Sequence, residues 1–283
     1  MTTNYFAQLE DKVCVLTGGG GVIGEALALA LGSVGIKTGV LDLNKEMADA
    51  VAEKVTSKYN VPCIGVEGNV LEEDSLLAAK KRIETELGPV DFLINGAGGN
   101  SPKATTSLEQ ITKDDLGRLN EGFFGIDLSG FDFAFNLNFK GTLLPSMIFG
   151  KDMVKRGSGS ILNISSMSAM RPLTKIPAYS AAKSAVNSLT EWLSVHFGPT
   201  GVRVNAIAPG FFLTNQNRFL LTEEKTGALT ARGHKIINNT PMGRFGDVEE
   251  LQGTVLFMLS DLSKFVTGVI IPIDGGFNAY SGV

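Results

Sequence analysis

KVCVLTGGGGVIGEALALALGS, residues 12–33, is the stretch that decides the fold. An apolar run at 12–16 has the length of a buried strand, and an alanine- and leucine-rich run at 25–33 favours a helix. Between them lies Thr17-Gly-Gly-Gly-Gly-Val-Ile-Gly24, whose glycines allow a tight turn and close approach to a pyrophosphate at the helix N-terminus. Strand, glycine loop and helix in this order predict a dinucleotide-binding unit, with a purely structural turn as the alternative.

Beyond this unit, apolar and amphipathic runs alternate to the end of the chain. We expect further strands at 37–41, 61–66, 90–94, 160–165, 202–207 and 269–273, and helices at 44–58, 71–87, 131–155, 178–193 and 243–260. Such alternation predicts an α/β fold: a Rossmann-like, doubly wound parallel sheet of about seven strands with helices on both faces. Residues 1–283 are expected to form a single domain.

An acidic residue ends the expected strand at 37–41. Asp42 follows Gly24 by 18 residues, which is close to the spacing of a carboxylate that accepts hydrogen bonds from an adenosine ribose. A carboxylate there repels a 2′-phosphate, and residues 38–44 contain no Arg or Lys. The sequence therefore favours NAD over NADP, with an ordinary surface aspartate as the alternative.

Tyr179-Ser-Ala-Ala-Lys183 carries the strongest chemical signal. Residues four apart share one face of a helix, so the Tyr179 hydroxyl and the Lys183 ammonium can point at one spot. A neighbouring cation lowers the pKa of a tyrosine from its usual value of about 10, which makes Tyr179 a candidate proton donor and acceptor. Ser166 ends an expected strand 13 residues earlier and can lie beside that helix. The alternative is a chance pair on a solvated helix.

Composition narrows the class of protein. The 283 residues are 43% hydrophobic and carry a net charge of −4 with a pI of about 5.4, which does not suggest nucleic acid or an anionic membrane as a partner. No apolar stretch approaches a membrane span, and residues 1–10 lack the pattern of a signal peptide. We expect Cys14 and Cys63 to be free thiols in a reducing cytoplasm, and His196 and His234 to form no metal site.

Taken together, these motifs resemble the short-chain dehydrogenase/reductase family over roughly residues 9–277. The resemblance implies four catalytic residues, Asn138, Ser166, Tyr179 and Lys183, with Asn138 in the segment Asn136-Leu-Asn-Phe-Lys-Gly141. A buried amide that only satisfies backbone groups is the alternative for Asn138. Two positions depart from the family pattern: Val22 stands where the loop usually has a glycine, and Asn69 stands where an aspartate is usual.

Cofactor contacts are expected from the loop, from Asp42 and from the family's Asn-Asn-Ala-Gly, Tyr-Lys and Pro-Gly segments. The full set is Thr17, Gly18, Gly21, Val22, Ile23, Gly24, Asp42, Asn69, Val70, Asn95, Ala97, Gly98, Tyr179, Lys183, Pro209, Gly210, Phe212 and Thr214.

Two segments are expected to surround a substrate. Residues 99–135 are about a dozen longer than the family leads one to expect, and could be functional, a surface elaboration or a subunit contact. Residues 211–240 are polar and are interpreted as a substrate lid. The resemblance also implies a homotetramer, with contacts through the helices around 139–153 and 185–197.

The polar segments around the expected pocket favour a polyhydroxylated anion. Candidate substrate residues are Asn100, Lys103, Arg171 and Arg218, of which Arg171 follows Ser166 by five residues and can bind a carboxylate in a bidentate fork. Solvation or an internal ion pair is the alternative for Arg171.

These segments resemble the branch of the family that contains bacterial D-mannonate oxidoreductases (fructuronate reductases). The expected activity is NAD(H)-dependent interconversion of a secondary alcohol and a ketone on a sugar acid, with D-mannonate and D-fructuronate as first candidates. Alternatives are a gluconate 5-dehydrogenase or other sugar or polyol dehydrogenase, a 3-oxoacyl thioester reductase, or a dinucleotide-binding protein without catalysis. A non-catalytic protein should have lost one of the four catalytic residues, and all four are present.

Overall fold

The apolar runs form a seven-stranded sheet in the order β3-β2-β1-β4-β5-β6-β7, in which every neighbouring pair is parallel. A computed structural model describes residues 5–214, 218–223 and 226–282, and the lid positions 215–217 and 224–225 lie outside the described residues. The strands are β1 (Val13–Thr17), β2 (Lys37–Asp42), β3 (Cys63–Glu67), β4 (Phe92–Asn95), β5 (Gly159–Ile164), β6 (Val202–Pro209) and β7 (Ile270–Ile273). The predicted doubly wound parallel sheet is confirmed.

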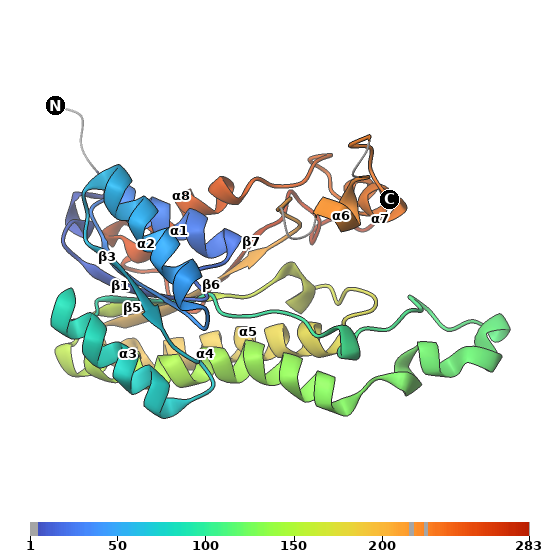
Figure 1. Cartoon of the computed structure of the whole chain (residues 1–283), viewed down its shortest axis with the longest axis horizontal. Helices are drawn as coiled ribbons and strands as arrows, with labels where there is room; N and C mark the ends of the chain where they lie inside the picture. Colours follow the sequence, from blue (N-terminus) through green and yellow to red (C-terminus); the bar gives the residue numbers. More distant parts are fainter. Residues whose placement is uncertain (1–4, 215–217, 224–225, 283) are drawn as a thin grey trace.

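Helices cover both faces of the sheet (Figure 1). On one face lie α1 (Val22–Ser33), α2 (Lys45–Tyr59) and α8 (Gln252–Leu259); on the other lie α3 (Glu73–Glu86), α4 (Leu128–Arg156) and α5 (Pro177–Phe197). Each face has its own buried apolar cluster, one built with α1, α2 and α8 and the other with α3, α4 and α5. Central strands such as β1 are buried at every position, as expected for strands covered on both sides.

Two predicted boundaries differ from the structure. Helix α4 begins at Leu128, so the last eight residues of the expected insertion at 99–135 belong to it, because the Asp127 carboxylate caps the Gly130 N–H. The helix expected at 243–260 is shorter: Gly243 has a φ of +67°, and the regular structure starts with a 3₁₀ turn at Val248–Leu251 before α8. Residues 99–127 contain short 3₁₀ turns, the longest at Lys113–Glu121.

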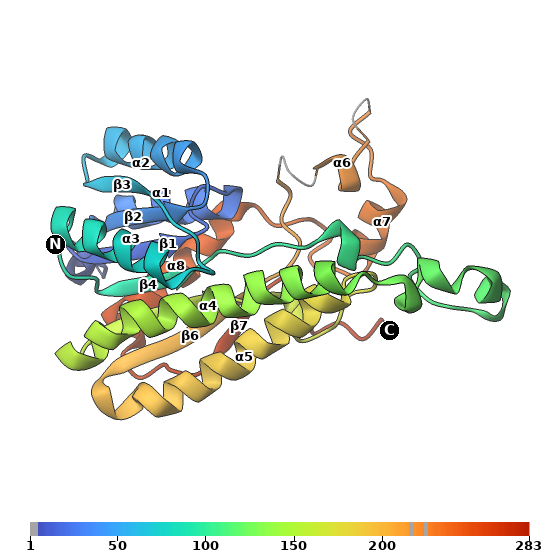
Figure 2. The same ribbon diagram turned by 60° about the horizontal axis from the view of Figure 1, so that its bottom comes forward.

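The order of the sheet fixes where a ligand can bind. Successive strands run outward from β1 to β3 on one side and from β4 to β7 on the other, so the order reverses between β1 and β4. Open parallel sheets bind ligands in the crevice beyond the carboxyl ends of the strands at such a point. The lid helices α6 (Arg218–Leu221) and α7 (Ala231–Asn238) and the insertion lie beyond the same end, and the insertion extends farthest from the sheet (Figures 1 and 2).

Within the described part of the chain, no helix has the length and apolar character needed to cross a bilayer. Cys14 and Cys63 are both free thiols, as predicted.

Candidate active site

The glycine loop is shaped by close backbone contacts that leave no room for side chains. Gly18 has a φ of +66°, and a Cβ there would lie 2.7 Å from the Ala97 Cα. A Cβ on Gly24 would lie 2.6 Å from the Gly18 carbonyl oxygen. The loop therefore folds back onto itself and onto the segment after β4, and α1 begins at Val22 directly after it. The N–H groups of Gly19, Gly20 and Gly21 donate within the protein, so in this cradle the first N–H groups of α1 are the ones that can meet a pyrophosphate.

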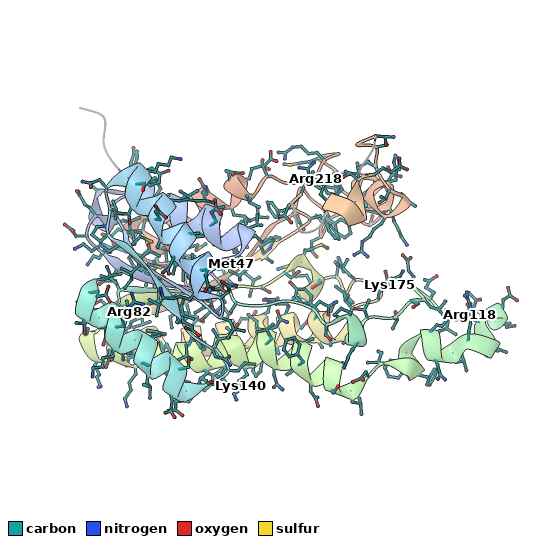
Figure 3. All side chains as sticks on the ribbon, in the orientation of Figure 1. Met47, Arg82, Arg118, Lys140, Lys175 and Arg218 are labelled. Carbon is teal, nitrogen blue, oxygen red and sulfur yellow. The ribbon has the colours of Figure 1, made fainter. Side chains whose placement is uncertain are left out.

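A cavity of about 470 Å³ opens beside this loop, within the size range of small-molecule sites. Ten of the residues proposed for the cofactor line it: Gly18, Gly21, Val22, Ile23, Gly24, Asp42, Gly98, Gly210, Phe212 and Thr214. Sequence analysis did not single out three other lining residues, Met47, Gly96 and Phe211. Met47 lies in the first turn of α2, directly after the Asn44 cap, and is labelled in Figure 3. The closeness of Met47 to Asp42 in the sequence was the signal from which its place in the cavity could have been predicted.

Asp42 holds the glycine loop as well as facing the cavity. Its two carboxylate oxygens accept from the Gly20 N–H and the Asn44 N–H, each at 3.0 Å. A carboxylate has about four acceptor positions, so two remain for a ribose diol. The carboxylate is thus fixed in place where it borders the cavity.

Eight proposed cofactor residues do not line the cavity, and two of them, Tyr179 and Lys183, belong to the catalytic group. The Thr17 hydroxyl accepts from the N–H groups of Gly96 and Ala97, and so ties the ends of β1 and β4 together. The Asn69 side chain accepts from the Leu71 N–H and donates to Glu72, ahead of α3. Val70 belongs to an apolar cluster, Asn95 is buried and Pro209 pairs with Ile273 in the sheet. These residues shape the site from behind: the side chains of Thr17 and Asn69 bond within the protein, and Asn95 donates within it while its buried Oδ1 has no hydrogen-bond partner in the described structure.

The catalytic candidates come together from three elements. Ser166, just after β5, hydrogen bonds to the side chain of Tyr179 in the first turn of α5, and it accepts from the Ser168 hydroxyl at 3.0 Å. Lys183 lies one turn further along, with its Nζ 5.7 Å from the centre of the Tyr179 ring. A Cβ on Gly98 would lie 3.2 Å from that Nζ, so the lysine reaches the wall of the cavity.

Burial dominates the electrostatics of this pair. Burial raises the pKa of Tyr179, and the hydrogen bond from Ser166 opposes that rise. Burial lowers the pKa of Lys183 to about 8, and its ammonium donates to the Ile164 carbonyl at 2.7 Å. The expected lowering of the tyrosine pKa by Lys183 is therefore not seen in the free protein, because the loss of hydration outweighs a cation directed at the backbone.

Asn138 lies in the middle of α4 and is completely buried. Its amide donates to the carbonyls of Gly99 and Ala134 and accepts from the Gly99 N–H. The alternative of an amide that satisfies backbone groups thus describes its side chain, which fixes the segment after β4 beside Lys183. The Asn138 carbonyl accepts from the Thr142 hydroxyl at 2.9 Å.

A buried network of polar side chains sets the relative positions of these elements. The Asn95 amide donates to Ser146 on α4 and to Asn163 on β5, and the Asn163 amide donates to Thr190 on α5. Each bond lies between 2.8 and 2.9 Å. Buried groups must keep their partners, so this network fixes the register between β5 and α5. Ser166 and Tyr179, which follow β5 and begin α5, are aligned by it.

The four candidate substrate residues lie in different environments. Arg171 is exposed and its Nε donates to the Asn278 carbonyl at 3.3 Å. Asn100 donates to the Thr105 hydroxyl. Hydrogen bonds from Ser129 and Gly130 lower the pKa of Asp127, the cap of α4, and the nearby charge of Lys103 adds a smaller lowering. Arg218 is exposed on the lid helix α6 (Figure 3). Among the described residues, neither Arg171 nor Arg218 has an acidic partner within ion-pair distance.

The lid and the insertion are joined by contacts that the sequence did not reveal. Lys235 on α7 forms an ion pair with Glu109 in the insertion, and this pairing lowers the pKa of Glu109. The Thr106 N–H donates to the carbonyl of Lys175, whose φ of +73° is unusual for a residue with a side chain. The insertion is thus linked both to the lid and to the loop that precedes α5.

Comparison with known proteins assigns the chain to a family. Residues 20–278 match the family described as enoyl-(acyl carrier protein) reductase, which belongs to the short-chain dehydrogenases/reductases. The chain is therefore a member of the short-chain dehydrogenase/reductase family and an NAD(P)-dependent oxidoreductase. Among the described residues, no group of three or more His, Cys, Asp or Glu side chains could hold a metal ion.

Several relatives are similar over almost their whole length. A Haemophilus influenzae crystal structure described as a candidate D-mannonate oxidoreductase with bound NAD superposes with a TM-score of 0.92 at 49% identity, covering 99% of this chain and 100% of the other. The Bacillus subtilis "Uncharacterized oxidoreductase UxuB" is 49% identical over 97% of this chain and 98% of its own. A Formosa agariphila 2-dehydro-3-deoxy-D-gluconate 5-dehydrogenase is 31% identical over 100% and 98% of the two chains.

Proposed function

We propose that this chain is an NAD(H)-dependent oxidoreductase that interconverts a secondary alcohol and a ketone on a sugar acid, with D-mannonate and D-fructuronate as the substrate pair. The observation that carries the proposal is the hydrogen-bonded pair of Ser166 and Tyr179 with Lys183 beside it, at the wall of a cavity bordered by the glycine loop and Asp42. The 49% identical candidate D-mannonate oxidoreductase with bound NAD supports both the cofactor and the substrate class.

The residues present fit NAD. A side chain at Gly18 or Gly24 would fill the cradle, so the bare backbone there suits a pyrophosphate, and the Asp42 carboxylate suits the adenosine ribose while repelling a 2′-phosphate. Lys183 would hold the nicotinamide ribose. NADH, when bound, supplies a hydride to the carbonyl carbon of the substrate.

Tyr179 donates its proton to the substrate oxygen in reduction and accepts it in oxidation. The raised pKa of Tyr179 keeps the phenol protonated at neutral pH, as a proton donor requires. Ser166 bonds to Tyr179 in the free protein, and on substrate binding its single O–H turns to donate to the substrate oxygen instead. Lys183 stabilises the phenolate left behind and returns it toward the protonated state. In this proposal Asn138 supports a water-linked proton path by holding the segment after β4, through the bond from its amide to the Gly99 carbonyl.

We propose Arg171 as the anchor of the substrate carboxylate. A carboxylate that enters a closed site loses its hydration, so it needs a cation that offers hydrogen bonds. Arg171 meets this need because no acidic side chain among the described residues pairs with it. Arg218 is the second candidate, and Lys103 is the weakest since Asp127 lies near it.

A second candidate function is a gluconate 5-dehydrogenase or a related sugar or polyol dehydrogenase. The 31% identical relative acts at carbon 5 of a deoxy sugar acid by its name, and such a substrate would use the same carboxylate anchor. A 3-oxoacyl thioester reductase is less well supported, because the relative described as a 3-oxoacyl-[acyl-carrier-protein] reductase is 33% identical, whereas the candidate D-mannonate oxidoreductase is 49% identical.

We also propose a cytoplasmic homotetramer. Free thiols at Cys14 and Cys63 suit a reducing compartment. Met147 on α4 and Trp192 and Val195 on α5 are 61%, 59% and 80% exposed, and they gather on the two helices expected to make subunit contacts. Light scattering coupled to size-exclusion chromatography measures the assembly, and a monomer would reject it.

A substrate panel tests the function directly. Sugar acids, the matching uncharged ketoses and polyols, and oxoacyl thioesters are assayed with NADH and NADPH in reduction and with NAD and NADP in oxidation. The proposal expects the highest kcat/KM for D-fructuronate with NADH. A higher kcat/KM for an uncharged sugar or a thioester would replace the proposed substrate class.

A further inference from the structure

The segment after β7, residues 274–280, forms a built turn, which we name the β7 extension. The two oxygens of the Asp274 carboxylate accept from the Gly276 N–H at 2.9 Å and from the Asn278 N–H at 2.8 Å. Gly275 and Gly276 have φ values of +63° and +90°, which only glycine adopts at little cost. The Tyr280 N–H donates to the Gly276 carbonyl at 3.1 Å.

This turn is fixed against the wall of the cofactor cavity. The Phe277 ring packs edge-on against Phe211, with 5.4 Å between ring centres, and Phe211 lines the cavity. The Gly210 N–H donates to the Ile273 carbonyl at 2.9 Å, just before the turn begins. The chain therefore leaves β7 in a fixed direction, toward the end of the molecule where the lid helices lie (Figures 1 and 2).

The β7 extension reaches the side chain of Arg171. The Asn278 carbonyl accepts from the Arg171 Nε at 3.3 Å, while the Arg171 N–H donates to the Met167 carbonyl at 3.0 Å, just after Ser166. The backbone and the side chain of Arg171 are thus each held by a hydrogen bond. A guanidinium carries five N–H donors, and the bond through Nε leaves the four on its terminal nitrogens for a carboxylate.

We propose that the β7 extension is a specificity element: the Asn278 carbonyl positions the Arg171 guanidinium so that its terminal nitrogens receive the carboxylate of the substrate. The inference rests on the proposed function. It goes further by assigning a role to a backbone group more than a hundred residues away from the arginine. Holding the side chain before substrate arrives lowers the entropy lost on binding.

Two matched deletions test the positioning role. Deleting residues 278–283 removes the Asn278 carbonyl, whereas deleting 281–283 leaves it in place and serves as the control. We expect the longer deletion to raise KM for the sugar acid about threefold to tenfold, the range that corresponds to ordering one long side chain, with kcat nearly unchanged. The KM for an uncharged ketose should not move in either variant. Unfolding temperatures of both variants report whether the fold is kept.

Combining the longer deletion with Arg171→Ala separates positioning from general damage. If the extension acts through Arg171, the deletion has no further effect on the KM for the sugar acid in the Arg171→Ala background. Independent losses that multiply, or an equal loss for charged and uncharged substrates, would overturn the inference. Failure of the proposed function is recognised separately, because the unmodified enzyme would then prefer an uncharged substrate or a thioester, and that result overturns both.

Discussion

The cofactor side of the crevice and its substrate side are built on different principles. On the cofactor side, contacts of its own backbone and of Asp42 fix the glycine loop. These contacts join residues close in sequence or on neighbouring strands. On the substrate side, three segments far apart in sequence meet: the insertion, the loop before α5 and the lid. The first arrangement depends on glycine geometry, and the second depends on exposed polar contacts between separate segments.

The difference indicates how each side tolerates change. A backbone cradle fails when a single methyl group is added, because backbone atoms cannot move aside without shifting the strands. An exposed ion pair such as Lys235–Glu109 contributes little by itself, so its loss changes the mobility of the lid more than its fold. The catalytic group lies between the two sides, and its removal should lower the activity more than a change on either side.

Tyr179→Phe should have the largest effect, because it removes the only group proposed to carry the proton. We expect kcat to fall roughly 10²- to 10⁴-fold, with little change in cofactor binding. Steady-state assay of sugar-acid reduction, with NADH titration by fluorescence, measures both. Tyr5→Phe is the control, since Tyr5 is 64% exposed and precedes β1. Near-normal kcat in Tyr179→Phe would reject the assignment.

The pH dependence should differ between the two directions of the reaction. Oxidation needs Tyr179 as a phenolate, and burial raises its pKa, so kcat/KM for the alcohol should rise about tenfold per pH unit from pH 7 to above about 10. Reduction needs the phenol, so its kcat/KM should stay flat from pH 6 to about 7.5 and should fall only where Lys183, with a pKa of about 8, loses its charge. A fall in the reduction rate already between about pH 6 and 7 would mean that Lys183 lowers the tyrosine pKa after all.

Gly18→Ala should break the cofactor side. The added Cβ would lie 2.7 Å from the Ala97 Cα, and the φ of +66° is strained for alanine. We expect the Kd for NAD, measured by calorimetry, to rise at least about tenfold. Gly253→Ala in α8 is the matched control, because no atom lies within 4 Å of its added Cβ. Equal affinities in the two variants would show that the loop is not the pyrophosphate cradle.

Asp42→Ser should weaken NADH binding, because Asp42 also holds the Gly20 N–H, and it should shift cofactor choice toward NADPH. Removal of the carboxylate takes away both the ribose acceptor and the charge that repels a 2′-phosphate. The ratio of kcat/KM with NADH to that with NADPH should fall about tenfold or more. Glu46→Gln removes another exposed carboxylate, in the first turn of α2, and therefore controls for general surface charge. A preference for NADPH in the unmodified enzyme would contradict the NAD proposal at once.

Lys235→Ala should have the smallest effect and should be confined to the substrate side. Losing the ion pair to Glu109 frees α7 from the insertion, and we expect KM for the sugar acid to rise about two- to threefold without any change in NAD affinity. High salt should reproduce the effect in the unmodified enzyme. Lys264→Ala is the control, since it removes a local surface pair with Asp261. A loss of NAD affinity would mean that the two sides are coupled.

The sequence alone determined the parts whose physics is local. Hydrophobic runs gave the strands to within a few residues, and the spacing of Tyr179 and Lys183 placed both side chains on one turn of α5, because a helix has a fixed period. The glycine loop was recognisable since only glycine permits such close backbone approach. The position of Asp42 at the end of β2 followed from the length of one strand and one helix.

Only the tertiary structure decided which hydrogen-bond partner each buried polar group has. Burial reversed the expected direction of the Tyr179 pKa shift, and backbone groups took up the amide of Asn138. Asn95 and Asn69, proposed for the cofactor, turned out to be bonded within the protein. The contacts of Arg171 with Asn278 and of Glu109 with Lys235 span more than a hundred residues each. No local sequence pattern predicts such contacts, because they depend on where the folded sheet places the ends of segments that are distant in sequence.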